Sequence, residues 1–187
     1  MVEILFESHG TTIDNEDHKS SGWFDVALSD LGKRQSAELG ERYKNENFDA
    51  IVCSDLQRSY NSAEIAFFDR GFPILQDKRL RECDYGDLTR RPSDEVDPAK
   101  ARYITEPFPN GESYEQTAER MKSFLDDLLK NYGGEKVMII GHRATQYGLE
   151  HRINKIPIKE AVTAPWKWQP GWVYRLKNIN ENRSSST

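Results

Sequence analysis

Val2-Glu3-Ile4-Leu5-Phe6 is a short apolar run that ends in the polar turn Ser8-His9-Gly10. A run of this length, bounded by a polar turn, is typical of a strand buried in a parallel sheet. The stretch from Lys136 to Ile140 has the same form and ends in Gly141-His142-Arg143. We therefore expect two buried strands, each with a histidine at its carboxyl end.

Helical patterns fill the segments between the apolar runs. Apolar residues recur at roughly helical spacing after Ser29, after Ser54-Asp55 and after Ser113, and these residue types favour the N-cap position. Ser113 and Gln116 also have the spacing of a capping box, and the long helix that they begin should end at Gly133-Gly134. A further helix is expected after His142.

Strands that alternate with helices predict a three-layer α/β/α fold, with a mostly parallel sheet and helices on both of its faces. Phe48 to Cys53 and Pro73 to Gln76 are the further strands expected in this sheet. Ligands of such sheets bind beyond the carboxyl ends of the strands. His9, Arg58 and His142 should therefore lie along one rim of the sheet, although they are far apart in the sequence.

We expect one domain, over residues 1–177. Residues 89–111 contain four prolines and little periodicity, which predicts an irregular, cap-like excursion over a pocket. Trp166, Trp168 and Trp172 are expected to pack a final edge strand, although one of them could line the pocket or a dimer contact. Residues 178–187 are polar and serine-rich, so we expect this tail to be disordered.

Composition limits the class of protein. The 187 residues carry a net charge of −5 and no Lys/Arg-rich run, which argues against nonspecific binding to nucleic acid. No apolar run is long enough to cross a bilayer and no basic segment precedes Val2, so we expect no membrane association, no signal peptide and a cytoplasmic location. Cys53 and Cys83 are expected to stay reduced.

An ordered set of motifs resembles those of the histidine phosphatase (phosphoglycerate mutase-like) superfamily. Ser8-His9-Gly10-Thr11-Thr12 resembles the family's arginine-histidine-glycine-x-threonine opening, and Asn15 falls where that family has a phosphate-contacting asparagine. The other matching stretches are residues 22–23, 28–32, 53–59, 80–88, 109–113 and 140–142. One such motif is a weak signal, but this ordered set covers most of the chain and is specific.

The resemblance implies a site for phosphoryl transfer. His9 would attack phosphorus and carry the phosphoryl group, which divides one difficult displacement into two easier steps. Arg58, His142 and Asn15 would donate hydrogen bonds to the phosphoryl oxygens, where charge develops. Glu82 would donate a proton to the leaving group and then accept one from water.

Ser8 is the main departure from the family pattern, because it replaces the arginine that usually precedes the nucleophilic histidine. Serine offers one neutral donor where arginine offers a charged, bidentate clamp, so activity should suffer unless another residue substitutes. Arg143 is the candidate substitute, and its pairing with a carboxylate such as Glu7 outside the pocket is an equally strong alternative. We expect Ser8, Gly10, Thr12 and Arg143 to contact the substrate together with Asn15.

Other basic residues match no motif. We assign no role to His18 or His151. Arg90, Arg91 and Arg102 lie in the excursion and could reach a second anionic group of a substrate, but a solvated surface is the default interpretation for them.

Several functions compete. Hydrolysis of a small phosphomonoester through a phosphohistidine is favoured, because the segment between Glu82 and His142 is short for the elaborated cap of a glycolytic mutase. The alternatives are a phosphoglycerate mutase-like phosphomutase, a catalytically weak phospho-ligand-binding or regulatory protein, and a protein-phosphohistidine phosphatase. No cofactor or metal is expected, because an arginine-lined anion pocket repels divalent cations. The expected partner is a small phosphorylated substrate, and a homodimer is compatible with the sequence.

Overall fold

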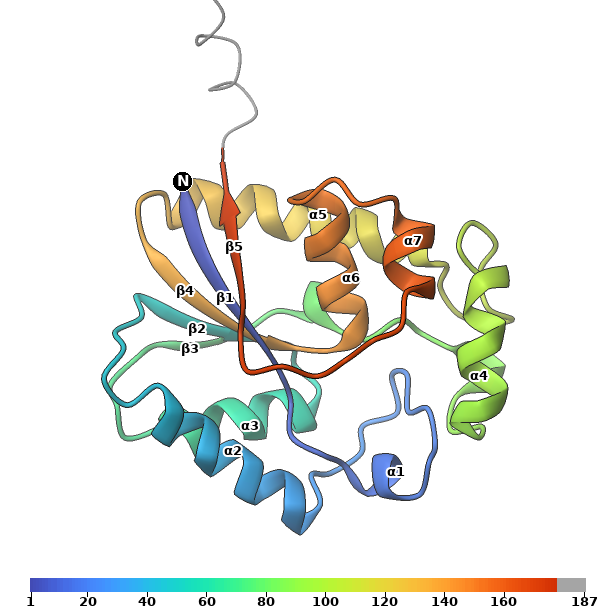
Figure 1. Ribbon diagram of the computed structural model, residues 1–187, viewed down its shortest axis with the longest axis horizontal. Helices are drawn as coiled ribbons and strands as arrows, with labels where there is room; N and C mark the ends of the chain where they lie inside the picture. Colours follow the sequence, from blue (N-terminus) through green and yellow to red (C-terminus); the bar gives the residue numbers. More distant parts are fainter. Residues whose placement is uncertain (178–187) are drawn as a thin grey trace, which may run out of the picture.

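The computed structural model describes residues 1–177, which include one five-stranded sheet with the order β3-β2-β4-β1-β5 (Figure 1). Neighbouring strands pair in parallel except β5, which runs antiparallel to β1. The strands are β1 (Val2–Ser8), β2 (Ala50–Cys53), β3 (Ile74–Gln76), β4 (Lys136–Gly141) and β5 (Trp172–Leu176). The predicted mostly parallel sheet is confirmed, and so is the final edge strand.

Helices lie on both faces of the sheet, as the α/β/α prediction requires (Figure 1). The α-helices are α1 (Ile13–Glu16), α2 (Asp30–Arg42), α3 (Gln57–Phe67), α4 (Ser93–Ala99), α5 (Tyr114–Asn131), α6 (Arg143–Arg152) and α7 (Ile158–Thr163). Short 3-10 helices are η1 (Lys78–Leu80), η2 (Gly86–Leu88) and η3 (Lys100–Arg102). The capping predictions for Ser29 and for Ser113 with Gln116 are confirmed.

Successive side chains of the strands enter different cores because they point to opposite faces of the sheet. Ile4 and Phe6 of β1 join the core under α5 and α6, whereas Leu5 joins the core under α2 and α3. None of the helices within residues 1–177 has both the length and the apolar character needed to cross a membrane. Cys53 and Cys83 are buried free thiols, as predicted.

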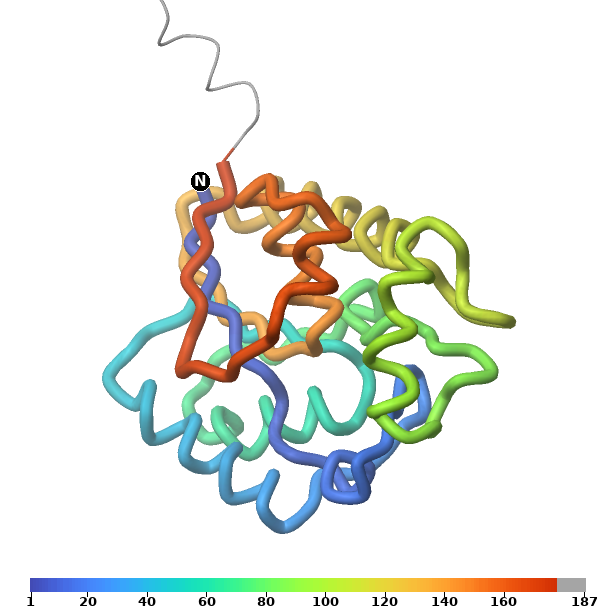
Figure 2. Tube along the Cα trace, turned by 45° about the vertical axis from the view of Figure 1, so that its right-hand side comes forward, coloured from blue at the N-terminus to red at the C-terminus, as the bar shows by residue number. Residues whose placement is uncertain are grey.

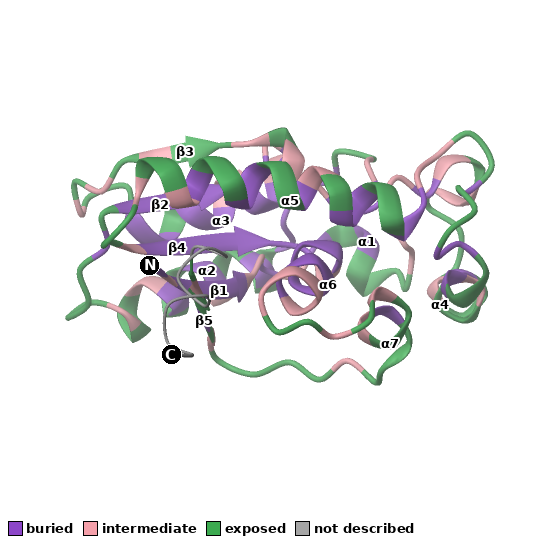
Figure 3. Cartoon of the chain, turned by 90° about the horizontal axis from the view of Figure 1, so that it is seen from above, coloured by how far each residue is buried: buried purple, intermediate pink, exposed green. Residues whose placement is uncertain are grey.

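The excursion of residues 89–111 is less irregular than predicted, because it contains α4 and η3. Pro92 precedes α4, where a missing N–H costs no hydrogen bond, and Val96 is fully buried in a third core against α6 and α7. Figure 3 shows α4 beyond the sheet, at the end of the molecule toward which β4 points. The tube in Figure 2 shows the same segment folding back beside the first loop of the chain.

The predicted N-cap of the second helix was wrong. The helix α3 begins at Gln57, and its N-cap is Leu56, which makes no side-chain cap hydrogen bond. Ser54 and Asp55 have other partners: the Ser54 hydroxyl lies 2.6 Å from His142, and Asp55 binds Arg81. The prediction that residues 178–187 are disordered lies outside the described residues.

Candidate active site

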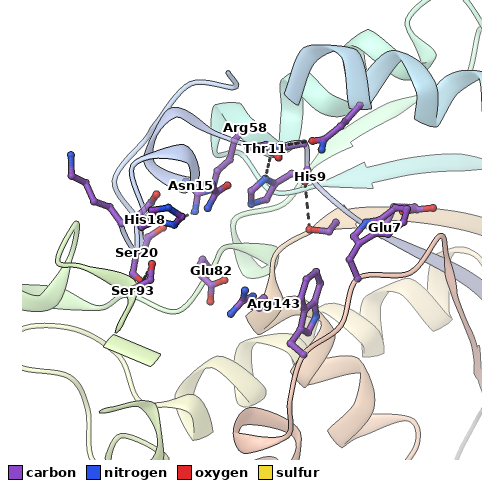
Figure 4. A pocket seen from close by; sticks show the side chains of 18 of the residues that line it. Glu7, His9, Thr11, Asn15, His18, Ser20, Arg58, Glu82, Ser93 and Arg143 are labelled. Atoms are coloured by element: carbon purple, nitrogen blue, oxygen red, sulfur yellow. Dashed lines mark hydrogen bonds between the residues drawn. The ribbon is translucent and has the colours of Figure 1, made fainter. Parts of the chain in front are cut away.

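A cavity of about 630 Å³ opens beyond the carboxyl ends of the strands. Ser8, His9 and Gly10 line it where β1 ends, Arg58 reaches it from α3, and Arg143 reaches it from the start of α6. Glu82 lines it from the loop after η1. Figure 4 shows the side chains of His9, Arg58, Glu82 and Arg143 around one space.

One ring nitrogen of His9 is held by the backbone. Its Nδ1 lies 2.7 Å from the Gly10 carbonyl oxygen, and since a carbonyl only accepts, Nδ1 carries the hydrogen and Nε2 keeps its lone pair. Burial, followed by the positive charges of Arg58 and Arg143, lowers the pKa of His9 to about 3. His9 is therefore neutral at ordinary pH.

Gly10 packs closely against the backbone of α2, which fixes the carbonyl that binds His9. Its N–H donates to the Ser62 hydroxyl at 3.0 Å, and a Cβ atom at this position would lie 2.4 Å from the Gly32 carbonyl oxygen. No larger residue fits without moving the backbone of α2. The role of Gly10 in the structure is thus to hold the carbonyl that orients His9.

His142 lies next to His9, with 4.9 Å between the two ring centroids. The His142 Nε2 is 2.6 Å from the Ser54 hydroxyl, whereas its buried Nδ1 has no hydrogen-bond partner within residues 1–177. Burial, with Arg58 as the next cause, holds the pKa of His142 well below its usual range. This imidazole is neutral, is 1% exposed and does not line the cavity, so its unpartnered nitrogen lies behind the His9 ring rather than open to the cavity.

Arg58 is a buried cation with a fixed guanidinium. Only 2% of the residue is exposed, and it donates to the carbonyl oxygens of Phe24 at 3.0 Å and Gly22 at 2.7 Å. Burial lowers its pKa, an effect that the nearby Glu82 carboxylate opposes. Its remaining N–H groups are available to an anion in the cavity.

Glu82 is 8% exposed, and its Oε1 accepts a hydrogen bond from the Cys83 amide at 2.8 Å. Its backbone carbonyl accepts from Trp23 Nε1 at 2.6 Å and from Arg120 Nη2 at 2.9 Å. The sequence motif included Trp23 without a role, and Arg120 had no sequence signal that distinguished it from a surface arginine of a long helix.

Arg143 lies in the cavity wall rather than outside it. Its guanidinium lies 4.9 Å from the centre of the Trp166 ring and 3.7 Å from Asp97. The alternative pairing with Glu7 was wrong, because Glu7 binds Arg42 at 2.9 Å. In Figure 4 the Arg143 side chain points toward Glu82.

Thr12 and Asn15 have different positions relative to the cavity. Asn15 lines it, whereas Thr12 is fully buried and caps α1, with its hydroxyl accepting from the Asn15 amide at 3.1 Å. The Thr12 amide donates in turn to Asn15 Oδ1 at 3.0 Å. In the structure Thr12 holds Asn15 and does not itself line the cavity.

His18, for which the sequence predicted no role, lies on the rim of the cavity, where its backbone carbonyl accepts from the Ser93 amide of α4. Trp166 and Trp168 also line the cavity, which was the alternative to packing the edge strand. Trp168 is 55% exposed and belongs to none of the three cores of the described residues. His151 binds the Ile156 carbonyl and has no place in the cavity wall. The excursion arginines bind protein groups: Arg90 pairs with Asp14, Arg91 with Glu95, and Arg102 lies over Tyr103.

Across residues 1–177, no three His, Cys, Asp or Glu side chains are grouped in a way that could hold a metal ion. Around Glu82 the cavity lining instead places His9, Arg58 and Arg143, and the His142 ring lies next to His9 without lining the cavity itself. Guanidinium and imidazole groups are donors suited to a phosphoryl group.

Comparison with known proteins defines the class. The family model of the histidine phosphatase superfamily (branch 1) matches residues 4–181, and the chain belongs to this superfamily. It is 33% identical over 149 residues to the uncharacterized phosphatase PhoE of Bacillus subtilis (strain 168), covering 80% of this chain and 76% of that protein. It is 29% identical over 150 residues to the probable phosphoglycerate mutase GpmB of Yersinia pestis (strain Pestoides F), covering 76% of this chain and 70% of that protein.

Solved structures share the fold. Bacillus stearothermophilus YhfR superposes with a TM-score of 0.82 at 24% identity, over 94% of this chain and 95% of that one. A mycobacterial glucosyl-3-phosphoglycerate phosphatase in complex with VO3 superposes with a TM-score of 0.77 at 24% identity, over 86% and 85%.

Proposed function

We propose that this chain is a metal-independent phosphatase that hydrolyses a small phosphomonoester through a phosphohistidine on His9. The observation that carries the proposal is the state of His9: a neutral imidazole whose Nδ1–H is bound to the Gly10 carbonyl, so that the Nε2 lone pair is available to the cavity. Membership of the superfamily and the phosphatase name of its Bacillus subtilis relative support it.

The first step forms a bond between His9 Nε2 and phosphorus while the bond to the leaving oxygen breaks. The electron pair goes to that oxygen, which takes a proton from the acid form of Glu82. The imidazole becomes positively charged, and the Gly10 carbonyl, which accepts from Nδ1–H, stabilises this charge. Arg58 and His142 donate to the phosphoryl oxygens during the transfer.

The second step returns the enzyme to its starting state. A water molecule attacks phosphorus, and Glu82, now a carboxylate, accepts the proton of that water. The bond between phosphorus and Nε2 breaks, and its electron pair returns to the ring of His9. Phosphate leaves, and no step needs a metal ion.

Arg143 supplies the second guanidinium in the place of the arginine that Ser8 replaces. Two contacts support this: its guanidinium lies in the cavity wall against Trp166, and its nearest carboxylate, Asp97, is 3.7 Å away and makes no hydrogen bond with it. Arg143 is therefore free to turn toward an anion. Asn15, which lines the cavity, is a further donor, and Ser8 adds one neutral hydroxyl.

The proposal includes a small phosphorylated substrate, which would bind in this cavity, and a cytoplasmic location for the protein. The two free thiols support this location, because reducing compartments preserve thiols.

Phosphate release from a panel of phosphomonoesters in the presence of EDTA tests the proposal. The wild type should turn over, His9→Ala should fall to background, and His18→Ala, which removes another cavity imidazole, should remain active; all three are first checked for folding by circular dichroism. Isomerisation of phosphoglycerates without phosphate release would favour the mutase, and phosphate binding without turnover would favour a binding protein.

Arg143→Ala tests the substitution for the missing arginine. Loss of a charged hydrogen bond to phosphate should lower phosphate affinity and kcat/KM about 10- to 100-fold. Arg91→Ala, which removes an exposed arginine paired with Glu95, is the matched control. Unchanged phosphate affinity in Arg143→Ala, measured by calorimetry, would overturn this assignment.

A further inference from the structure

We infer that the alcohol released from the substrate is uncharged and carries a ring, which packs against Trp168. This inference rests on the proposed function and names the class of substrate. The cavity of about 630 Å³ lies within the range of sites that bind drug-sized ligands, so it has room for a leaving group much larger than the phosphoryl group itself.

Trp168 offers an open aromatic surface to the cavity. It lines the cavity and is 55% exposed, so much of its ring surface is open to a ligand in the cavity. The Arg42 guanidinium lies 5.5 Å from the centre of its ring, and this arginine is held by the buried Glu7 at 2.9 Å. The support behind the ring is thus fixed before a ligand arrives.

This aromatic wall begins at the phosphoryl site. Trp166, two residues earlier, lines the same cavity and lies against Arg143, with 4.9 Å between the guanidinium and the ring centre. Leu39 of α2 adds an apolar side chain to the lining. A phosphomonoester held by Arg143 therefore has an apolar and aromatic surface within the same cavity for its leaving group.

Charge argues against a second anionic group on the substrate. Three of the lysines and arginines that line the cavity already have carboxylate partners at 2.9 Å or less: Lys19 with Asp17, Arg42 with Glu7, and Lys100 with Asp97. Arg58 and Arg143 are needed by the doubly charged phosphoryl group. Within residues 1–177, no lysine or arginine of the cavity remains for a carboxylate of the leaving group.

Glu38 of α2, one helical turn before the Arg42 that contacts Trp168, strengthens this argument. It lines the cavity, is exposed, and makes no salt bridge with any residue of the described chain. A carboxylate on the leaving group would meet this negative charge, whereas a neutral ring would not. Phosphoglycerates are therefore poor substrates, and phosphate esters of sugar-like or aromatic alcohols are good ones.

Three alkyl phosphates test the inference at pH 8, where histidines carry little charge. Benzyl phosphate should exceed 3-phosphoglycerate in kcat/KM by about tenfold or more, with glycerol phosphate between them. Trp168→Ala should lower kcat/KM for benzyl phosphate about 3- to 10-fold and leave glycerol phosphate nearly unchanged, and Trp168→Phe should retain most of the benzyl preference.

Phe68→Ala is the matched control, because Phe68 is 72% exposed and is not among the lining residues. It should leave all three substrates unchanged. A preference for 3-phosphoglycerate over benzyl phosphate, or an equal loss on all three substrates in Trp168→Ala, would overturn the inference.

Binding separates this inference from the proposed function. Calorimetry compares 2-phenylethylphosphonate with 3-phosphonopropionate, which differ in a phenyl ring against a carboxylate and cannot be hydrolysed. Tighter binding of the phenyl compound, lost in Trp168→Ala, supports the ring site even if no phosphomonoester is turned over. Tighter binding of the carboxylate contradicts it, whatever the turnover.

Discussion

At the scale of single residues, the donor role proposed for His142 depends on which of its two ring nitrogens carries the hydrogen. The Ser54 hydroxyl, 2.6 Å from Nε2, has no other hydrogen-bond partner within residues 1–177. If this hydroxyl donates to Nε2, the hydrogen of the neutral ring must be on Nδ1, which is buried without a protein partner. Donation by Ser54 thus gives His142 the tautomer that the proposed mechanism requires, with a hydrogen on Nδ1.

Ser54→Ala should lower kcat/KM about tenfold or more, because the His142 ring loses the contact that sets its tautomer. The unfolding free energy should also fall by about 1–2 kcal/mol, since a buried nitrogen is left without a partner. Thr117→Val is the control: it removes another buried hydroxyl, which donates to the Ser113 carbonyl at 3.1 Å and contacts neither Ser54 nor the imidazole. Steady-state kinetics measures the activity of both variants, and urea unfolding measures their stability. An equal loss of activity in the two variants would contradict the assignment.

At the scale of elements, the helix α5 holds the loop that carries the proposed proton donor. Arg120 of α5 donates to the carbonyl oxygens of Arg79 at 2.6 Å, Arg81 at 2.8 Å and Glu82 at 2.9 Å. Glu112 binds the same guanidinium at 3.0 Å. One side chain thus fixes the backbone on both sides of Arg81 and Glu82, and so the position of the Glu82 carboxyl group.

Replacing Arg120 with Met should lower kcat about tenfold with little change in KM, because Glu82 loses its position while the phosphoryl donors stay in place. The unfolding free energy should fall by roughly 2–3 kcal/mol. Arg152→Met is the control, because Arg152 also binds both a backbone carbonyl, that of Ala118 at 3.0 Å, and a carboxylate, that of Glu119. This variant should lower the unfolding free energy without lowering kcat. A rise in KM alone in Arg120→Met would contradict the positioning role.

The sequence predicts elements well where one local signal decides them. The apolar runs of β1 and β4 and the capping box at Ser113 have the predicted positions. Prediction failed where a distant partner decides: Ser54 binds His142 rather than capping α3, and α4 forms in a proline-rich segment because Val96 is buried in the third core. Such partners cannot be read from spacing along the chain.

At the scale of the whole molecule, the site joins elements from both ends of the chain. The pairing of β1 with β4 places Ser8 beside Gly141, and this register brings His9 and His142 to one rim. The sequence predicted this meeting of the two histidines from the rule for parallel sheets. It offered a tryptophan in the cavity wall only as an alternative and favoured packing on the edge strand, because Trp166 and Trp168 lie in a segment between α7 and β5 without a periodic pattern.

The two buried neutral imidazoles make the stability of the whole fold depend on pH. The pKa of His9 is lowered to about 3 by burial, Arg58 and Arg143, and the pKa of His142 is also held well below its usual range, chiefly by burial. An unfolded chain binds protons at both histidines below about pH 6.5. The folded chain binds a proton at His9 only near pH 3, and at His142 only well below the usual range. The unfolding free energy should therefore fall as the pH drops through this interval.

Each imidazole contributes at most about 1.4 kcal/mol per pH unit to this slope. Urea unfolding between pH 6.5 and 5 should show a smaller slope in His9→Gln than in the wild type, because only His142 then remains as a buried imidazole of this site. His18→Asn, which removes an exposed histidine, is the control and should keep the wild-type slope. An unchanged slope in His9→Gln would show that His9 takes up its proton in the folded protein, and the neutral nucleophile would then need another explanation.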